Sequence, residues 1–117
     1  LCATAVTIKM CILGKSGFLE AARQCLAKAE HLKSEIAKLP GYALPFAAPT
    51  FNEITISVRG GDASALADAL VAKGIIAGYD LGRSSADRKD QLLLAVTERH
   101  TRADLDRLVA ALAAYPS

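Results

Sequence analysis

The sequence predicts an α+β domain, a small antiparallel or mixed sheet covered by helices. Three patterns support this prediction. Residues 16–39 have the apolar spacing of a long amphipathic helix, residues 54–58 alternate as a half-buried strand does, and residues 92–96 are a continuous apolar run of strand length. The chain has 117 residues, of which 52% are hydrophobic and 22% are charged, enough for one domain with a packed core.

The first third of the chain predicts two helices that are separated at Gly14. Apolar residues recur every three or four positions in residues 1–13, and Gly14 interrupts them. Ser16 has the place of a cap for the second helix, which Pro40 ends. Charged residues lie opposite its apolar stripe, and we interpret them as a solvated face. The stripe consists of Phe18, Ala22, Cys25, Ala29, Leu32, Ile36 and Leu39.

Strand signals follow the second helix. Residues 42–50 contain two prolines and predict an extended edge piece or a loop. Residues 54–58 predict a strand with one buried face, and the run 92–96 predicts a central strand. Between them, residues 75–81 predict a short extended segment, and residues 83–90 predict a polar loop.

Two further helices have terminal signals. Asp62 or Ser64 caps a short helix that closes before Gly74. Thr101 and Asp104 have the spacing of a capping box, which predicts the start of the last helix.

Composition argues against two classes of partner. The formal charge is only +2 and its cations are scattered, so we expect no nucleic-acid interface. No apolar run approaches the roughly 20 residues of a membrane span, so we expect no membrane partner.

The cysteines and histidines do not form a metal or nucleophile motif. Cys2, Cys11 and Cys25 fit no metal or redox spacing, and we interpret them as packing cysteines of a reduced, cytoplasmic protein. His31 and His100 show no spacing typical of a catalytic triad, and we interpret them as surface or capping residues. No metal ligand is predicted.

Glycine motifs are equally uninformative. Residues 14–16 imitate the end of a phosphate-binding loop, but Lys9 stands where that loop needs glycine, so a turn between helices is the better interpretation. Gly78 and Gly82 do not complete a dinucleotide-binding fingerprint and are interpreted as turn glycines.

Polar pairs at strand ends are the remaining candidates. Asn52 and Glu53 begin one predicted strand, and Thr97 and Glu98 follow another. Functional residues gather at such places, although most strand-end polar residues are simply solvated. The residues alone therefore predict no catalytic and no cofactor-binding residue.

Four segments, taken in order, carry a family resemblance. They are residues 12–18 (ILGKSGF), 51–53 (FNE), 74–83 (GIIAGYDLGR) and 93–109 (LLAVTERHTRADLDRLV). Through them the chain resembles, over nearly its whole length, subunit 1 of the glycine cleavage system P-proteins, glycine dehydrogenase (decarboxylating).

This resemblance implies the fold of the C-terminal small domain of fold-type I pyridoxal-phosphate (PLP) enzymes. Residues 1–117 would form one such domain, with a long helix at about residues 16–39 and a sheet-and-helix part at about residues 42–115. The large domain would then be missing, which agrees with a helix that begins at Leu1 without a cap.

The resemblance also implies an activity for the complete complex. PLP would serve as the electron sink for glycine decarboxylation, and the aminomethyl group would pass to lipoyl H-protein. The PLP-bearing lysine would belong to the partner, P-protein subunit 2, and none of the seven lysines here lies in a PLP-lysine motif. Residues 91–96 lack the arginine with which many fold-type I enzymes hold the substrate carboxylate. We therefore expect a structural role, no PLP on this fragment and no activity of the fragment alone.

Two alternatives stay open at this point. One is the small domain of another fold-type I PLP enzyme, a cysteine desulfurase or a class V aminotransferase. The other is a free-standing regulatory α+β module that binds a metabolite or a partner.

Overall fold

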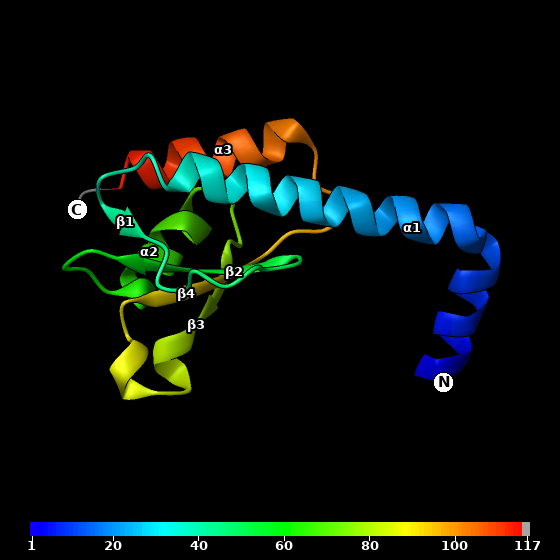
Figure 1. Ribbon diagram of the computed structural model, residues 1–117. Helices are drawn as coiled ribbons and strands as arrows, with labels where there is room; N and C mark the ends of the chain where they lie inside the picture. Colours follow the sequence, from blue (N-terminus) through cyan, green and yellow to red (C-terminus); the bar gives the residue numbers. More distant parts are fainter. Residues whose placement is uncertain (116–117) are drawn as a thin grey trace.

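Four short strands form one antiparallel sheet in the order β1-β2-β4-β3 (Figure 1). The computed structural model describes residues 1–115. The elements are α1 (Cys2–Ile36), β1 (Tyr42–Ala43), β2 (Glu53–Val58), α2 (Ala63–Ala72), β3 (Gly78–Asp80), β4 (Gln91–Ala95) and α3 (Arg102–Ala113). The predicted α+β class is confirmed, and every strand pairing in the sheet is antiparallel.

The two central strands give the sheet one apolar face. Ile54 and Ile56 of β2 are buried and stand opposite Leu94 and Leu92 of β4. The intervening residues of both strands are only partly covered or exposed. Because side chains alternate along a strand, one face is buried and the other is not, as the sequence predicts for residues 54–58.

All three helices contribute side chains to the cluster on this face. Figure 1 shows α3 lying alongside the second part of α1, above the sheet. The buried helical side chains are Ala29, Leu32 and Ile36 of α1, Ala63, Leu66 and Leu70 of α2, and Leu105, Leu108, Ala111 and Leu112 of α3. The core is therefore a single layer of apolar side chains between sheet and helices.

Gly14 divides α1 into two helices, as predicted. Its backbone angles are φ 62° and ψ −178°, a conformation essentially restricted to glycine. Figure 1 shows the first part of α1 turning away from the sheet at this bend. The predicted cap at Ser16 is wrong, because Gly14 takes the non-helical position and Ser16 lies within the helix.

The second part of α1 ends at Ile36, three residues before the predicted end at Leu39. Leu39 precedes Pro40, and the proline ring disfavours helical backbone at the preceding residue.

The chain then enters β1, where the hydroxyl of Tyr42 donates to the carbonyl oxygen of Leu112 at 2.9 Å. Burial raises the pKa of Tyr42 to about 12, so this hydroxyl keeps its proton.

The signals at the other helix termini are confirmed. Asp62, rather than Ser64, caps α2, and its carboxylate accepts from the backbone N–H of Ser64 at 2.7 Å. Gly74 follows α2 with φ 71°, as predicted for a helix end. Thr101 and Asp104 form the predicted capping box of α3.

The segment between α2 and β4 is only partly as predicted. Of the extended residues 75–81, only Gly78–Asp80 pair with the sheet. Two short 3₁₀ turns follow: Leu81–Arg83 begins at the end of the predicted extended segment, and Ala86–Arg88 lies within the predicted polar loop. Asp80 starts the first turn by accepting from the backbone N–H of Gly82 at 2.8 Å.

Two of the three cysteines contradict their interpretation as packing residues. Cys25 is buried, but Cys2 and Cys11 are exposed. The difference follows from the bend at Gly14, because it directs residues 2–13 away from the core while residues 15–36 pack against it.

The expectation that no segment is long and apolar enough to cross a membrane is wrong on composition. A window of α1 has mean hydropathy 1.3, and none of that window is buried. The first part of α1, residues 2–13, gives only about 18 Å of straight helix, against a hydrocarbon core of about 30 Å. The hydropathy of α1 is therefore weak evidence for a membrane span.

We expect Ile56→Ala to lower the free energy of unfolding by about 2–5 kcal/mol, because Ile56 is fully buried in the central strand. The matched control is Ile76→Ala, which removes the same atoms from a side chain that is 89% exposed and should change stability by less than about 0.5 kcal/mol. Urea unfolding of both variants measures the difference. Equal losses would contradict this placement of the core.

Candidate functional site

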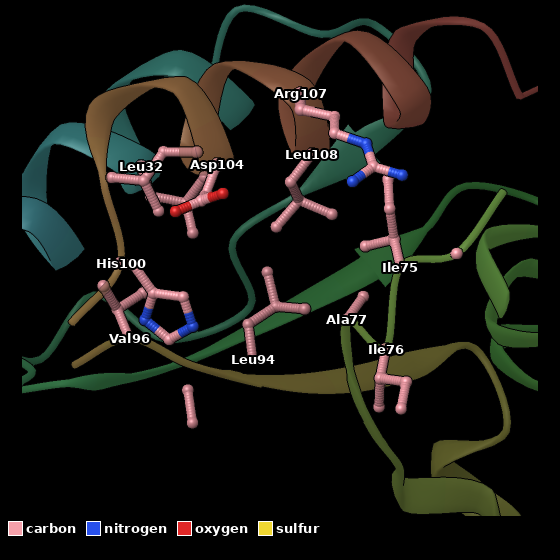
Figure 2. A pocket seen from close by; sticks show the side chains of 13 residues that line it. Leu32, Ile75, Ile76, Ala77, Leu94, Val96, His100, Asp104, Arg107 and Leu108 are labelled. Atoms are coloured by element: carbon pink, nitrogen blue, oxygen red, sulfur yellow. The ribbon is translucent and has the colours of Figure 1, made fainter.

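A pocket of about 210 Å³ lies where the end of β4, the start of α3 and the segment after α2 meet (Figure 2). Its apolar wall includes Leu94 of β4, Val96 directly after β4, and Leu108 of α3. Figure 2 shows the polar side chains His100 and Arg107 on opposite sides of this wall. The remaining lining residues are Leu32, Gly74, Ile75, Ile76, Ala77, Ala95, Asp104 and Leu105.

The His100 side chain holds the turn that follows β4. Its Nδ1 atom accepts from the backbone N–H of Thr97 at 2.9 Å, which places the proton of the neutral ring on Nε2. The hydroxyl of Thr97 in turn accepts from the backbone N–H of Arg99 at 3.3 Å. His100 is therefore a capping residue, as the sequence predicts.

Asp104 is committed to the start of α3. Its Oδ2 atom accepts from the hydroxyl and from the backbone N–H of Thr101, both at 2.7 Å. The hydrogen bond from the Thr101 hydroxyl, followed by the one from the Thr101 backbone, lowers the pKa of Asp104. The carboxylate thus occupies the positive end of the helix, where an anionic ligand would otherwise bind.

Arg107 joins the end of α2 to α3. Its Nη2 atom donates to the carbonyl oxygen of Lys73 at 2.7 Å, across 34 positions of sequence. This carbonyl belongs to the C-cap of α2, where backbone oxygens lack helical partners. The guanidinium therefore satisfies a helix end and positions the segment that lines the pocket.

The three polar side chains of the pocket thus bind backbone groups or, in Asp104, also a neighbouring hydroxyl. The lining contains no lysine, serine or cysteine, so it offers neither a PLP-anchoring amine nor a nucleophile beside a base. The pocket does not fit PLP. Its geometry suits a structural junction more than a reaction centre.

The structure brings the two strand-end candidates together. Glu53 pairs with Ala95, and the carbonyl oxygen of Asn52 accepts from the backbone N–H of Val96 at 2.8 Å. Thr97 and Glu98 continue from this same end of β4. The four candidates lie at one end of the two central strands, where Asn52 and Glu53 take part in the backbone pairing of the sheet.

Glu98 connects this end of the sheet to α1. Its carboxylate accepts from the Cys25 thiol at 3.7 Å and lies 4.0 Å from the ammonium of Lys9. Lys28 donates to its carbonyl oxygen at 2.5 Å. A hydrogen bond from its own backbone N–H is the main cause that lowers the pKa of Glu98. Glu98 thus belongs to the contact between the sheet and α1.

His31 lies outside the pocket, between α1 and α3. Its Nε2 atom is buried without a hydrogen-bond partner and lies 3.9 Å from Oδ1 of Asp106. The residues described, 1–115, contain no cluster of three or more His, Cys, Asp or Glu side chains that could hold a metal ion.

The Glycine cleavage system P-protein family model matches residues 1–112. The chain belongs to this family. A probable glycine dehydrogenase (decarboxylating) subunit 1 from Sorangium cellulosum is 70% identical over 115 residues, which are 98% of this chain and 25% of that relative. A protein of the same name from Chlorobium limicola is 46% identical over 97% of this chain and 25% of its own length. The chain therefore spans about a quarter of these curated relatives.

Solved structures agree with the family. The chain matches a crystal structure of glycine decarboxylase (P-protein) with a TM-score of 0.81 and 27% identity, over 91% of this chain and 24% of that one. A C-DES variant with glycine linked to its PLP cofactor matches with a TM-score of 0.71 and 15% identity, over 83% and 24%. A NifS-like protein matches with a TM-score of 0.65 and 17% identity, over 80% and 28%. The last two likenesses show a shared fold alone, that of fold-type I PLP enzymes.

Sequence reasoning missed the pocket and the role of Arg107. The hydrogen bond from Arg107 to the carbonyl oxygen of Lys73 joins two helices that are distant in sequence, and no local sequence pattern predicts such a contact. The glycine after α2 was the one available signal, since it marks a helix end whose carbonyl groups need donors.

We expect Asp104→Asn to lower the free energy of unfolding at neutral pH. The variant should also lose less of this free energy than the unchanged chain when the pH is lowered into the acid range. The folded-state pKa of Asp104 is lowered, so its contribution is present above the unfolded value of about 3.9 and is lost as the pH falls through the lower folded value. Urea unfolding at a series of pH values measures this effect. Asp68→Asn, at an exposed position on α2, is the matched control, and equal behaviour of the two variants would refute the role of Asp104.

Proposed function

We propose that this chain is the C-terminal small domain of a P-protein subunit 1 and acts in PLP-dependent glycine decarboxylation as a structural element. The observation that carries the proposal is the 70% identity to a subunit-1 protein over nearly the whole chain. The structure supports a supporting role, because His100, Asp104 and Arg107 are occupied in holding backbone groups.

In this proposal the chemistry resides elsewhere in the complex. P-protein subunit 2 supplies the lysine that anchors PLP, which is the electron sink for decarboxylation, and lipoyl H-protein accepts the aminomethyl group. The present chain belongs to subunit 1 of this cytoplasmic complex. From there it shapes and orients the neighbouring active site. The lysine-free lining of the pocket is consistent with this division.

We expect the chain alone to bind no PLP covalently and to catalyse no glycine–bicarbonate exchange. The Schiff-base absorption band after addition of PLP and the exchange of labelled bicarbonate into glycine are the two measurements. The positive control is the full-length Sorangium cellulosum relative combined with its subunit 2 and H-protein. Either signal from the chain alone would overturn the proposal.

A chimera tests the positive half of the proposal. In it, this chain replaces the matching 115 residues of the Sorangium cellulosum relative. Once combined with subunit 2 and H-protein, the chimera should retain exchange activity, because the replaced part supports the site and is 70% identical. A folded chimera without activity would contradict the proposed role.

A further inference from the structure

The first part of α1, residues 2–13, has the composition of a buried helix. Only Thr4, Thr7 and Lys9 are polar among these residues, and the polar positions do not form a continuous face. A helix that is apolar nearly all round is normally enclosed by protein or by lipid. We call residues 2–13 the N-terminal apolar helix.

This helix is nevertheless uncovered. Every residue from 1 to 12 is exposed, and the exposed fraction reaches 54% for Ile8 and 78% for Ile12. Within the described residues 1–115, the 4.0 Å pair between Lys9 and Glu98 is the one ion pair that links the helix to the body of the domain. Figure 1 shows the helix projecting beyond the sheet and the other helices.

The bend at Gly14 is what separates this helix from the domain. A residue with a side chain would be strained at φ 62°, yet nothing lies within 4 Å of the place of its Cβ atom. The domain's own packing therefore does not account for the bend. The bend directs the helix away from the sheet and the other helices.

We propose that the N-terminal apolar helix docks into the remaining part of the same subunit. The family model matches the chain from residue 1, so the helix is part of the family's shared sequence. In the curated relatives the matched segment is a quarter of a subunit, so three quarters of the polypeptide are available to cover it. This inference rests on the proposed identity of the chain as one domain of a subunit 1, and it does not depend on the proposed role in catalysis.

The chemistry of the helix favours an occupant within the subunit. Its surface is apolar with a single charge, as expected of a permanent contact, whereas transient interfaces are more polar. A segment joined covalently to its docking site also has a high effective concentration there. The N-terminal apolar helix thus holds this domain against the rest of its subunit.

Cysteine labelling tests the inference, because Cys2 and Cys11 are exposed on the helix while Cys25 is buried in the domain. Alkylation rates are measured for each cysteine by peptide mass spectrometry, in the chain alone and in the chimera defined above. We expect Cys2 and Cys11 to react at least about tenfold more slowly in the chimera without subunit 2, since a covered thiol waits for local opening. Slow labelling of Cys25 in both proteins reports that the domain is folded.

A pair of variants in the chimera sharpens the test. Ile8→Asp places a charge on the helix and should restore fast labelling of Cys2 and Cys11. Val71→Asp makes the same kind of change at a position of α2 that is 57% exposed, and it should preserve protection. Neither change enters the core.

Three results would overturn the inference. Fast labelling of Cys2 and Cys11 in the chimera would mean that the helix stays uncovered. If these thiols were protected only after subunit 2 is added, the helix would dock on the partner subunit. Protection in the chain alone that grows with concentration would assign it to a second copy. Labelling does not depend on activity, so the inference can fail while the proposed function stands, and the reverse.

Discussion

The burial of one apolar sheet face is the constraint on which the rest of this structure depends. Alternate side chains of β2 and β4, among them Ile56 and Leu92, are opposed across the centre of the sheet and must be removed from water. Each helix covers that face with buried side chains, among them Leu32 of α1, Leu70 of α2 and Leu112 of α3. The C-terminal ends of the helices follow, since each helix ends at or soon after its last buried residue.

The polar residues complete this packing. Asp62 and Asp104 supply acceptors for backbone N–H groups at helix starts, and Arg107 supplies a donor for a carbonyl group at a helix end. His100 does the same for the turn after β4. These polar side chains thereby satisfy backbone groups and do not form a reaction centre. This is the physical basis of the proposal that the domain has a supporting role.

Local features of the fold were predictable from the sequence, and distant ones were not. The strand at residues 54–58, the capping box at Thr101 and the break at Gly14 each depend on a few neighbouring residues. The pocket and the contact between Arg107 and Lys73 depend on how separate helices meet. The exposure of Cys11 was misjudged because an apolar pattern predicts a helix but does not say what covers it.

The described residues form one self-sufficient core and one helix, residues 2–13, that lies outside it. Native-state hydrogen exchange of the chain tests this claim most directly. We expect the amides of β2, β4 and the second part of α1 to exchange only through global unfolding, while those of residues 2–13 exchange at nearly the rate of an unprotected helix. Protection of residues 2–13 equal to that of β4 in the monomeric chain would contradict the claim.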